Sequence, residues 1–333
     1  VWDAYGHLWK PDEIINDIFR VENEFHPITI GVEQTGLHEF IMQPLRQEQL
    51  RRGYAIPVRA LNAPKGKMDF IRGLQPFAKA GEIIFAKELT EARAQFLSFP
   101  TGRIDIPNAL AYALRLRPGQ PMYEGFNVHN IVEDLKPVDR FPIWLAVNGT
   151  TLYTSAALVQ IVDGAFHVLS DWVREGDPGA VLSDIVGSAR LDAGRPPRVI
   201  GGLAHFSNHD TVGMRGAARK IPVELRRGGS ELAGRDELRS LLRRLIRGQP
   251  AVRISTQARW TLNALSGGYA KEVEKNGMLT EFAVDGPYRV LMEGIESFAS
   301  LLKGTMLAED DAPINYAYTP DGRKYISALV KHG

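Results

Sequence analysis

The stretch PITIGVEQTG, residues 27–36, decides how the first half of the chain is interpreted. Ile28, Ile30 and Val32 form a compact run of β-branched residues between a proline and a glycine, which is typical of a buried strand. Glu33 stands at the carboxyl end of this run, where a loop must begin. Because α/β proteins build their sites at the carboxyl ends of strands, Glu33 is either a functional acid or a solvated residue that leaves the core.

Length and composition indicate a globular protein with room for two domains. The chain has 333 residues, of which 44% are hydrophobic and 24% charged, and about 100–200 residues per domain is usual. No apolar run approaches the ~20 residues that span a bilayer, so no membrane segment is predicted. The net charge is +1, so a nucleic acid would need a local basic patch. The absence of cysteine excludes disulfides and thiolate metal sites and favours a reducing compartment.

Helices and strands alternate along residues 1–117. Strands are predicted at 1–5, 28–33, 55–61 and 82–85. Helices are predicted at about 9–21, 37–52, 68–79, 88–96 and from 105 onwards. The order β-α-β-α-β-α-β-α-α predicts a doubly wound or mixed α/β domain.

Five segments in this half follow one another in a specific order. They are DAY (3–5), GVE (31–33), KGKMDFIRGLQPF (65–77), GEIIF (81–85) and LSFPTGRIDIPNALAYA (97–113). Together they resemble the C-terminal nuclease domain of the large terminase subunit of tailed bacteriophages, an RNase H-like fold with a mixed sheet flanked by helices. No single segment is diagnostic, whereas the ordered set is specific. A Holliday-junction or transposase-type relative would share the acids but not the LQPF and LSFPTG segments.

The resemblance implies a metal-dependent nuclease site. In the family, acids from the first strand, a later strand end and the start of the last helix converge on Mg²⁺ or Mn²⁺. Two such ions, about 3.5–4 Å apart, activate water and steady the leaving oxygen. Glu33 matches the second acid and Asp105 the third, although Asp105 also suits an N-cap. Asn108 stands where a further Asp is usual, so it offers an oxygen without a charge.

The sequence departs from the family's pattern in two further places. The first-strand Asp would lie upstream of Asp3, and the chain begins with Val1, so we expect a fragment that lacks its first nuclease strand. The histidine that often precedes the acids is replaced by Ile104. A complete site therefore requires another carboxylate.

The resemblance also implies a set of partners. Lys65, Lys67 and Arg72 match the basic segment near the family's active site, where they would contact DNA phosphates; otherwise they belong to a solvated loop. The implied partners are double-stranded DNA, the terminase ATPase domain, the small terminase subunit and the portal protein. The implied location is the cytoplasm of the infected bacterial host. No Gly-rich phosphate loop appears, so the motor ATPase is not in this sequence.

A second α/β pattern follows a proline-rich stretch. We interpret residues 118–143 as a linker, 144–305 as a second domain and 306–333 as a tail. Three adjacent strands, a helix, a strand and further helices repeat the order of an RNase H-like domain. This half is interpreted either as a degenerate copy of the nuclease or as an unrelated α/β domain.

The acids of the second half form a broken set. Asn148 stands in place of the first acid, and the second is missing around residues 203–205. Asp285, Glu293 and Glu296 remain near the last helix.

The predicted function is metal-dependent endonucleolytic cleavage of concatemeric double-stranded DNA, a hydrolase reaction on phosphodiester bonds. Glu33 and Asp105 are the predicted catalytic metal ligands, with Asn108 beside them. The alternative is a catalytically inactive DNA-binding or packaging-assembly module, which the missing first Asp, Asn108 and the broken second half favour.

Overall fold

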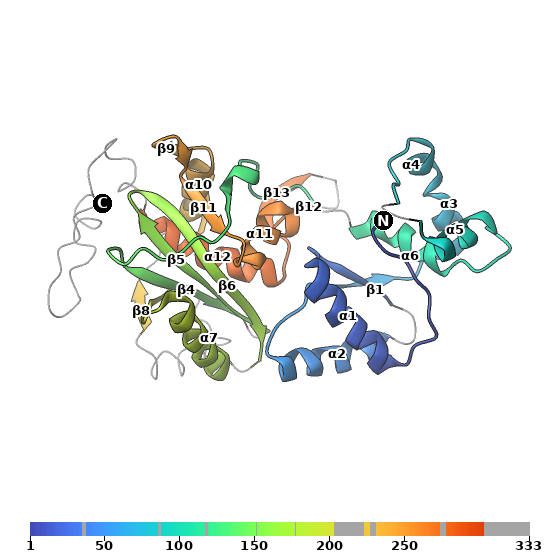
Figure 1. Cartoon of the computed structure of the whole chain (residues 1–333), viewed down its shortest axis with the longest axis horizontal. Coiled ribbons are helices and arrows are strands. Elements are labelled where there is room, and N and C mark those ends of the chain that lie inside the picture. The colour runs from blue at the N-terminus through green and yellow to red at the C-terminus, as the bar shows by residue number, and fades with distance from the viewer. Residues whose placement is uncertain are drawn as a thin grey trace. The chain divides into compact units, whose positions relative to one another are not determined.

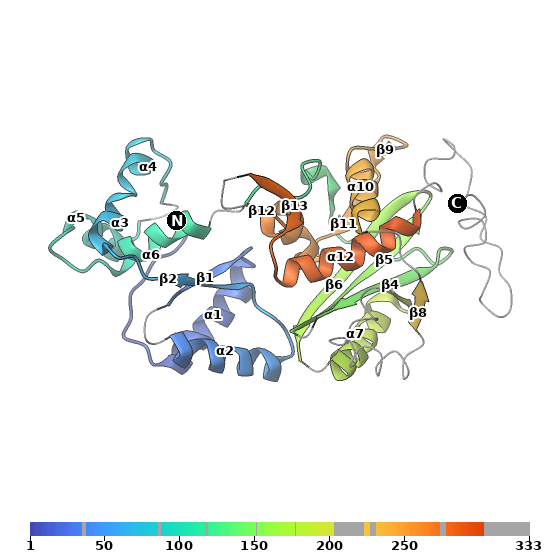
Figure 2. The same cartoon turned by 180° about the vertical axis from the view of Figure 1, so that it is seen from behind.

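The protein is described by a computed structural model that covers residues 1–34, 38–85, 88–116, 119–150, 152–176, 178–202, 223–226, 231–273 and 278–302. The chain divides into two compact units (Figures 1 and 2). The first unit comprises Val1–Glu48 and Ile56–Pro118, and the second comprises Gln49–Ala55 and Gly119–Gly333. No helix in the described part of the chain is long and apolar enough to cross a membrane.

The first unit contains a two-stranded parallel sheet. β1 (Ile30–Gln34) pairs with β2 (Val58–Asn62), and Glu33 lies opposite Leu61. The helices of this part of the chain are α1 (Pro11–Phe25), α2 (His38–Arg52), α3 (Lys67–Arg72), α4 (Gln75–Lys79), α5 (Thr90–Leu97) and α6 (Asp105–Ala113). A 3-10 turn, η1 (Leu114–Leu116), follows α6 directly.

The helix α1 forms for reasons that the sequence contains. Pro11 occupies its first turn, where a missing N–H costs nothing, and the Glu13 carboxylate accepts a hydrogen bond from the Lys10 N–H at 2.7 Å. The helix ends at His26, which adopts a left-handed conformation with φ of 45°. Residues spaced three and four apart form its buried stripe: Ile15, Ile18 and Phe19.

Two of the predicted strands are not formed in the first unit. Residues 1–5 and 82–85 are irregular, although the Val1 amino group donates to the Ile84 carbonyl oxygen at 2.5 Å. Within the described residues, neither segment pairs with β1 or β2. The apolar side chains of residues 82–85 were therefore not enough to form the predicted strand, and Ile84 and Phe85 are exposed.

The second unit is built on a seven-stranded mixed sheet in the order β3-β11-β6-β5-β4-β7-β8. Its strands are β3 (Ile131–Val132), β4 (Ile143–Gly149), β5 (Tyr153–Val162), β6 (Ala165–Glu175), β7 (Arg198–Gly202), β8 (Val223–Arg226) and β11 (Val252–Ser255). β4, β5 and β6 form an antiparallel meander, and β7 and β8 continue in parallel beside β4. The strands β6, β5, β4, β7 and β8 stand in the order of an RNase H-like sheet, so the predicted fold class is confirmed in the second unit, whereas the described residues of the first unit form only the two-stranded sheet.

Helices cover both faces of this sheet (Figures 1 and 2). Alternate residues of β4 point to opposite faces. Ile143, Leu145 and Val147 pack with the helix α7 (Pro178–Ala193), whereas Trp144 contacts Phe298 of α12 (Pro287–Ala299). Because β4 is buried on both faces, its sequence is a nearly continuous apolar run.

The remaining elements of this unit are short or lie on the face of α12. They are η2 (Val128–Asn130), α10 (Glu231–Leu242), β9 (Leu245–Ile246), β10 (Gln249–Pro250), α11 (Arg259–Asn263), the π-turn η4 (Ala264–Gly268), β12 (Lys271–Val273), β13 (Leu279–Ala283) and η5 (Ser300–Leu302).

Most of the stretch predicted as a linker is part of the second unit. Met122 and Tyr123 are buried, β3 joins the sheet beside β11, and the Asn130 amide donates to the Val252 carbonyl oxygen at 3.0 Å. Prolines occur in buried irregular segments as well as in linkers, so composition alone did not distinguish the two. Residues 306–333, predicted as a tail, lie outside the described residues.

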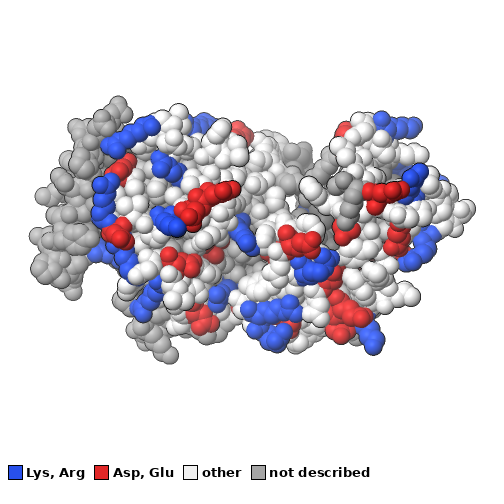
Figure 3. Space-filling model, viewed as in Figure 1, with Lys and Arg blue, Asp and Glu red and all other residues white. Residues whose placement is uncertain are grey.

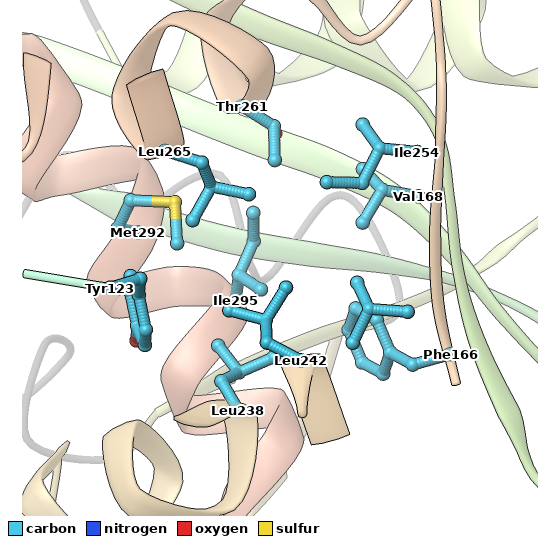
Figure 4. A pocket seen from close by; sticks show the side chains of 11 residues that line it. Tyr123, Phe166, Val168, Leu238, Leu242, Ile254, Thr261, Leu265, Met292 and Ile295 are labelled. Atoms are coloured by element: carbon cyan, nitrogen blue, oxygen red, sulfur yellow. The ribbon is translucent and has the colours of Figure 1, made fainter. Parts of the chain in front are cut away.

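A small apolar cavity lies between this sheet and its helices (Figure 4). It measures about 10 Å³ and is lined by Phe166, Val168 and Ile254 from the sheet and by Leu238, Leu242 and Met292 from the helices, among others. This volume holds about one water-sized sphere, and an apolar lining keeps such a cavity dry. It is therefore a packing defect and not a ligand site.

Candidate functional site

Glu33 lies at the carboxyl end of β1, as predicted, and faces α6. A Cβ atom on Gly31 would lie 2.6 Å from Leu116 Cδ1 and 2.7 Å from Leu61 Cδ1, so glycine permits η1 and β2 to approach β1 closely. Asn108 Nδ2 donates a hydrogen bond to Glu33 Oε2 at 3.2 Å. The tertiary structure thus brings together two of the three predicted ligands.

Asn108 has one oxygen that the described residues leave unsatisfied. The residue is 5% exposed, and no described group donates to its buried Oδ1. A buried amide oxygen without a partner costs roughly 1–3 kcal/mol. Because Nδ2 is engaged with Glu33, Oδ1 is free to accept a ligand, and a hard cation or a water molecule would satisfy it.

Tyr112 lies one turn after Asn108 on α6 and was missed by the sequence reasoning. Its buried hydroxyl lies near the Glu33 carboxylate, although without hydrogen-bond geometry. Burial, and then the negative charge of Glu33, raise the pKa of Tyr112, so the hydroxyl stays neutral. The spacing of Asn108 and Tyr112, four residues apart, was the available signal, because it places them on one helix face.

Asp105 begins α6 as predicted but does not meet Glu33 through any described contact. Its side chain is 58% exposed and pairs with Arg103 at 3.1 Å. The cap position belongs to Ile104, so Asp105 is not the N-cap of the helix. Among the described residues, no three acidic or histidine side chains are grouped to hold a metal ion.

The predicted phosphate contacts Lys65, Lys67 and Arg72 are all exposed, on α3 or immediately before it. Arg72 pairs with Asp69 at 2.7 Å. α3 packs against α6, because the Phe70 and Tyr112 rings lie edge to face at 5.0 Å. The basic segment is therefore on a neighbouring helix, but no described contact joins it to Glu33.

In the second unit, two of the acids near the last helix, Asp285 and Glu293, form ion pairs with an arginine. Asn148, at the end of β4, is buried and donates to the Val290 carbonyl oxygen at 2.8 Å and to Glu293 Oε2 at 3.5 Å. Arg289 donates to Glu293 at 2.6 Å and to Asp285 at 2.5 Å. The guanidinium thus places a positive charge beside the buried Glu293, whereas the side chain of Asp285 is also exposed to solvent.

Glu296, the other acid of this helix, is structural. It is fully buried and accepts hydrogen bonds from Arg235 at 3.1 Å and from Tyr123 at 2.5 Å. Burial raises the pKa of Glu296, while Arg235 opposes that rise. Residues 203–205, where the sequence lacks a second acid, lie outside the described residues.

Comparisons with known proteins return phage large terminases. No family model and no curated protein matches the chain. The large terminase of a thermophilic bacteriophage is similar at 10% identity over 87% of this chain and 89% of that chain, with a TM-score of 0.43. The magnesium-bound large terminase nuclease of the thermophilic phage G20c is similar at 14% identity over 56% of this chain and 94% of that chain, with a TM-score of 0.35.

The manganese-bound nuclease domain of the large terminase from bacteriophage SPP1 is also similar. The identity is 12% over 54% of this chain and 97% of that chain, with a TM-score of 0.36.

Proposed function

We propose that the chain is the nuclease part of a tailed-bacteriophage large terminase subunit. It would cleave concatemeric double-stranded DNA during packaging, in the cytoplasm of the infected bacterium, with Mg²⁺ or Mn²⁺. The observation that carries this proposal is the contact between Glu33 and Asn108, with its buried and unsatisfied Oδ1 atom. The ordered motifs of residues 1–117 support it independently.

The residues fit a divalent cation by their chemistry. Glu33 and Asn108 supply carboxylate and amide oxygens, the ligands that Mg²⁺ and Mn²⁺ prefer. A bound ion would lower the pKa of a water molecule and neutralise charge at a phosphodiester group. The Asn108 amide holds Glu33 Oε2 in place, which leaves the amide oxygen oriented for a ligand.

Asp105 is proposed as the second carboxylate of this site, beside Glu33. It lies three residues before Asn108 on α6, so both residues lie on neighbouring positions of one helix face. Its ion pair with Arg103 is solvent-exposed, and such pairs contribute at most about 1 kcal/mol. Opening this pair to release Asp105 is therefore inexpensive compared with metal binding.

DNA would reach the site along the first unit. Lys65, Lys67 and Arg72 are proposed to contact backbone phosphates, which position the duplex without reading its bases. The terminase ATPase domain, the small terminase subunit and the portal protein are the partners proposed for the complete assembly.

A catalytically inactive DNA-binding or assembly module is the second candidate. The observation that favours it is the second unit, where Arg289 pairs with both Glu293 and Asp285. That arrangement gives both carboxylates the same guanidinium partner, so the buried Glu293 already has a cation beside it.

Nicking of supercoiled plasmid in Mn²⁺ or Mg²⁺ separates the two candidates. The parent chain is compared with Glu33→Ala and Asp105→Ala, and with Asp134→Ala as a matched control, because Asp134 is an exposed acid far along the chain that pairs with Lys136. Metal-dependent nicking that both site variants lose and the control keeps is the expected result. A parent chain that neither nicks DNA nor binds Mn²⁺ would leave the inactive module.

A further inference from the structure

Lys and Arg side chains are interspersed with Asp and Glu side chains over the face that Figure 3 shows, so an anion site on that face requires a fixed local geometry. One pair of arginines in the first unit has such a geometry. Arg115 Nη1 donates to the Asn62 carbonyl oxygen at 2.7 Å, which ties η1 to the end of β2. Arg59 Nη1 donates to the Arg115 carbonyl oxygen at 3.4 Å. Both side chains are held by backbone oxygens, and both hydrogen bonds are solvent-exposed.

Two aromatic rings fix the Arg115 guanidinium further. Its Cζ lies 4.3 Å from the centre of the Phe70 ring and 5.4 Å from that of Tyr112. A guanidinium over aromatic faces loses little side-chain entropy when it binds an anion, because it is already oriented. Within the described residues, neither Arg59 nor Arg115 forms an ion pair with a carboxylate.

The pair belongs to the same surface as Glu33. Asn108, Tyr112 and Arg115 follow one another at helical spacings of four and three residues. Gly31 and Glu33 share one face of β1, and Leu116, next to Arg115, packs against Gly31. Tyr112 lies between Asn108 and Arg115 along the chain, on α6, and the Arg115 guanidinium lies over its ring.

We propose that Arg59 and Arg115 form a subsite for a backbone phosphate of double-stranded DNA beside Glu33. The identity of the substrate rests on the proposed function, whereas binding at the subsite does not depend on cleavage. Planar guanidinium groups bind phosphate oxygens through paired N–H donors. They also offset the charge of Glu33, which by itself repels a phosphate.

The chemistry differs from that of the lysines predicted from sequence. Lys65 and Lys67 are exposed ammonium groups on flexible stems, which attract a polyanion without fixing its position. Arg115 is held at three points, by one carbonyl oxygen and two rings. The subsite therefore sets where a phosphate lies relative to the acids, and the lysines contribute to overall attraction.

The test is binding of a short fluorescent DNA duplex in EDTA, measured by anisotropy over about 50–200 mM NaCl. Arg115→Ala is expected to weaken binding roughly tenfold and to lower the salt slope by about one. Arg59→Ala is expected to weaken it in the same direction. Arg115→Lys keeps the charge but not the planar contact, so it is also expected to bind more weakly than the parent.

Arg93→Ala is the matched control, because Arg93 is an exposed arginine of the same unit that pairs with Glu88. Unchanged affinity and salt slope in both Arg59→Ala and Arg115→Ala would overturn the subsite, as would an equal loss in Arg93→Ala. Competition by inorganic phosphate at constant ionic strength distinguishes the ligand: displacement at millimolar phosphate would show a site for free phosphate and overturn the assignment to DNA.

Thermal unfolding verifies that each variant is folded. If Arg115→Ala does not fold, Arg59→Ala still tests the subsite. EDTA removes the metal, so this assay measures DNA binding without cleavage. If the parent chain does not nick DNA but the two arginine variants bind DNA more weakly, the proposed cleavage is refuted and the proposed subsite is supported.

Discussion

Asn108→Asp is the substitution that most directly tests the proposed metal centre. It places a second carboxylate where the Asn108 amide now donates to Glu33 at 3.2 Å. Two charges at that distance repel by about 5 kcal/mol at an effective dielectric constant of about 20. The pair can relieve this repulsion by holding one proton, which at pH 7 costs about 4 kcal/mol for a carboxyl group of ordinary pKa. We therefore expect the metal-free variant to lose about 2–4 kcal/mol of stability, including the lost hydrogen bond.

A divalent cation should reverse this loss, because it replaces the repulsion by attraction to both carboxylates. The assay is thermal unfolding in EDTA and in millimolar Mn²⁺ or Mg²⁺, with the parent chain and Asn108→Ala alongside. Asn108→Ala removes the amide donor without adding a charge, so it should lose about 1 kcal/mol and show no rescue beyond that of the parent. An Asn108→Asp variant that is as stable as the parent in EDTA, or that no metal rescues, refutes the reasoning.

Three further predictions concern the second unit. Burial, helped by Arg253, lowers the pKa of His167 to about 4; the unfolded chain therefore protonates first, and stability falls by up to about 3 kcal/mol from pH 6.5 down to pH 4. Urea unfolding followed by tryptophan fluorescence should show this slope as the difference between the parent and His167→Gln, because the raised pKa of Asp171, about 6, acts with the opposite sign in both proteins. Gly234→Ala would place a Cβ atom 1.9 Å from the Glu296 carbonyl oxygen, and should cost at least about 1–3 kcal/mol in the same assay. Arg289→Ala leaves the buried Glu293 carboxylate without its ion-pair partner and should destabilise the unit by roughly 1–3 kcal/mol. Arg289→Lys should recover part of that loss.

The two units differ in the side chain that contacts the carboxylate beside the end of a strand. In the first, Glu33 is met by a neutral amide whose oxygen remains available. In the second, Glu293 is met by a guanidinium at 2.6 Å. The first arrangement leaves a carboxylate that a cation can satisfy, and the second supplies its own cation. This contrast is the reason why the proposed metal centre is in the first unit.

Local patterns determined several features by themselves. The β-branched run before Glu33 predicted β1, and the proline and acids after Trp9 predicted α1. The three adjacent strands predicted at the start of the second domain correspond to β4, β5 and β6, which the structure shows to be antiparallel. These predictions succeeded because periodicity and capping are encoded within a few neighbouring residues.

Only the tertiary structure determined which segments pair as strands and which distant side chains come into contact. Residues 82–85 carry strand-forming side chains but remain irregular, because a strand forms only where the backbone also pairs with another strand, which local preference does not decide. The contact between Glu33 and Asn108 joins positions 75 residues apart, and it depends on the close approach of η1 to Gly31. The orientation of Arg115 depends on Phe70, from a different helix. Sequence patterns report local preference, whereas convergence of distant side chains is set by packing.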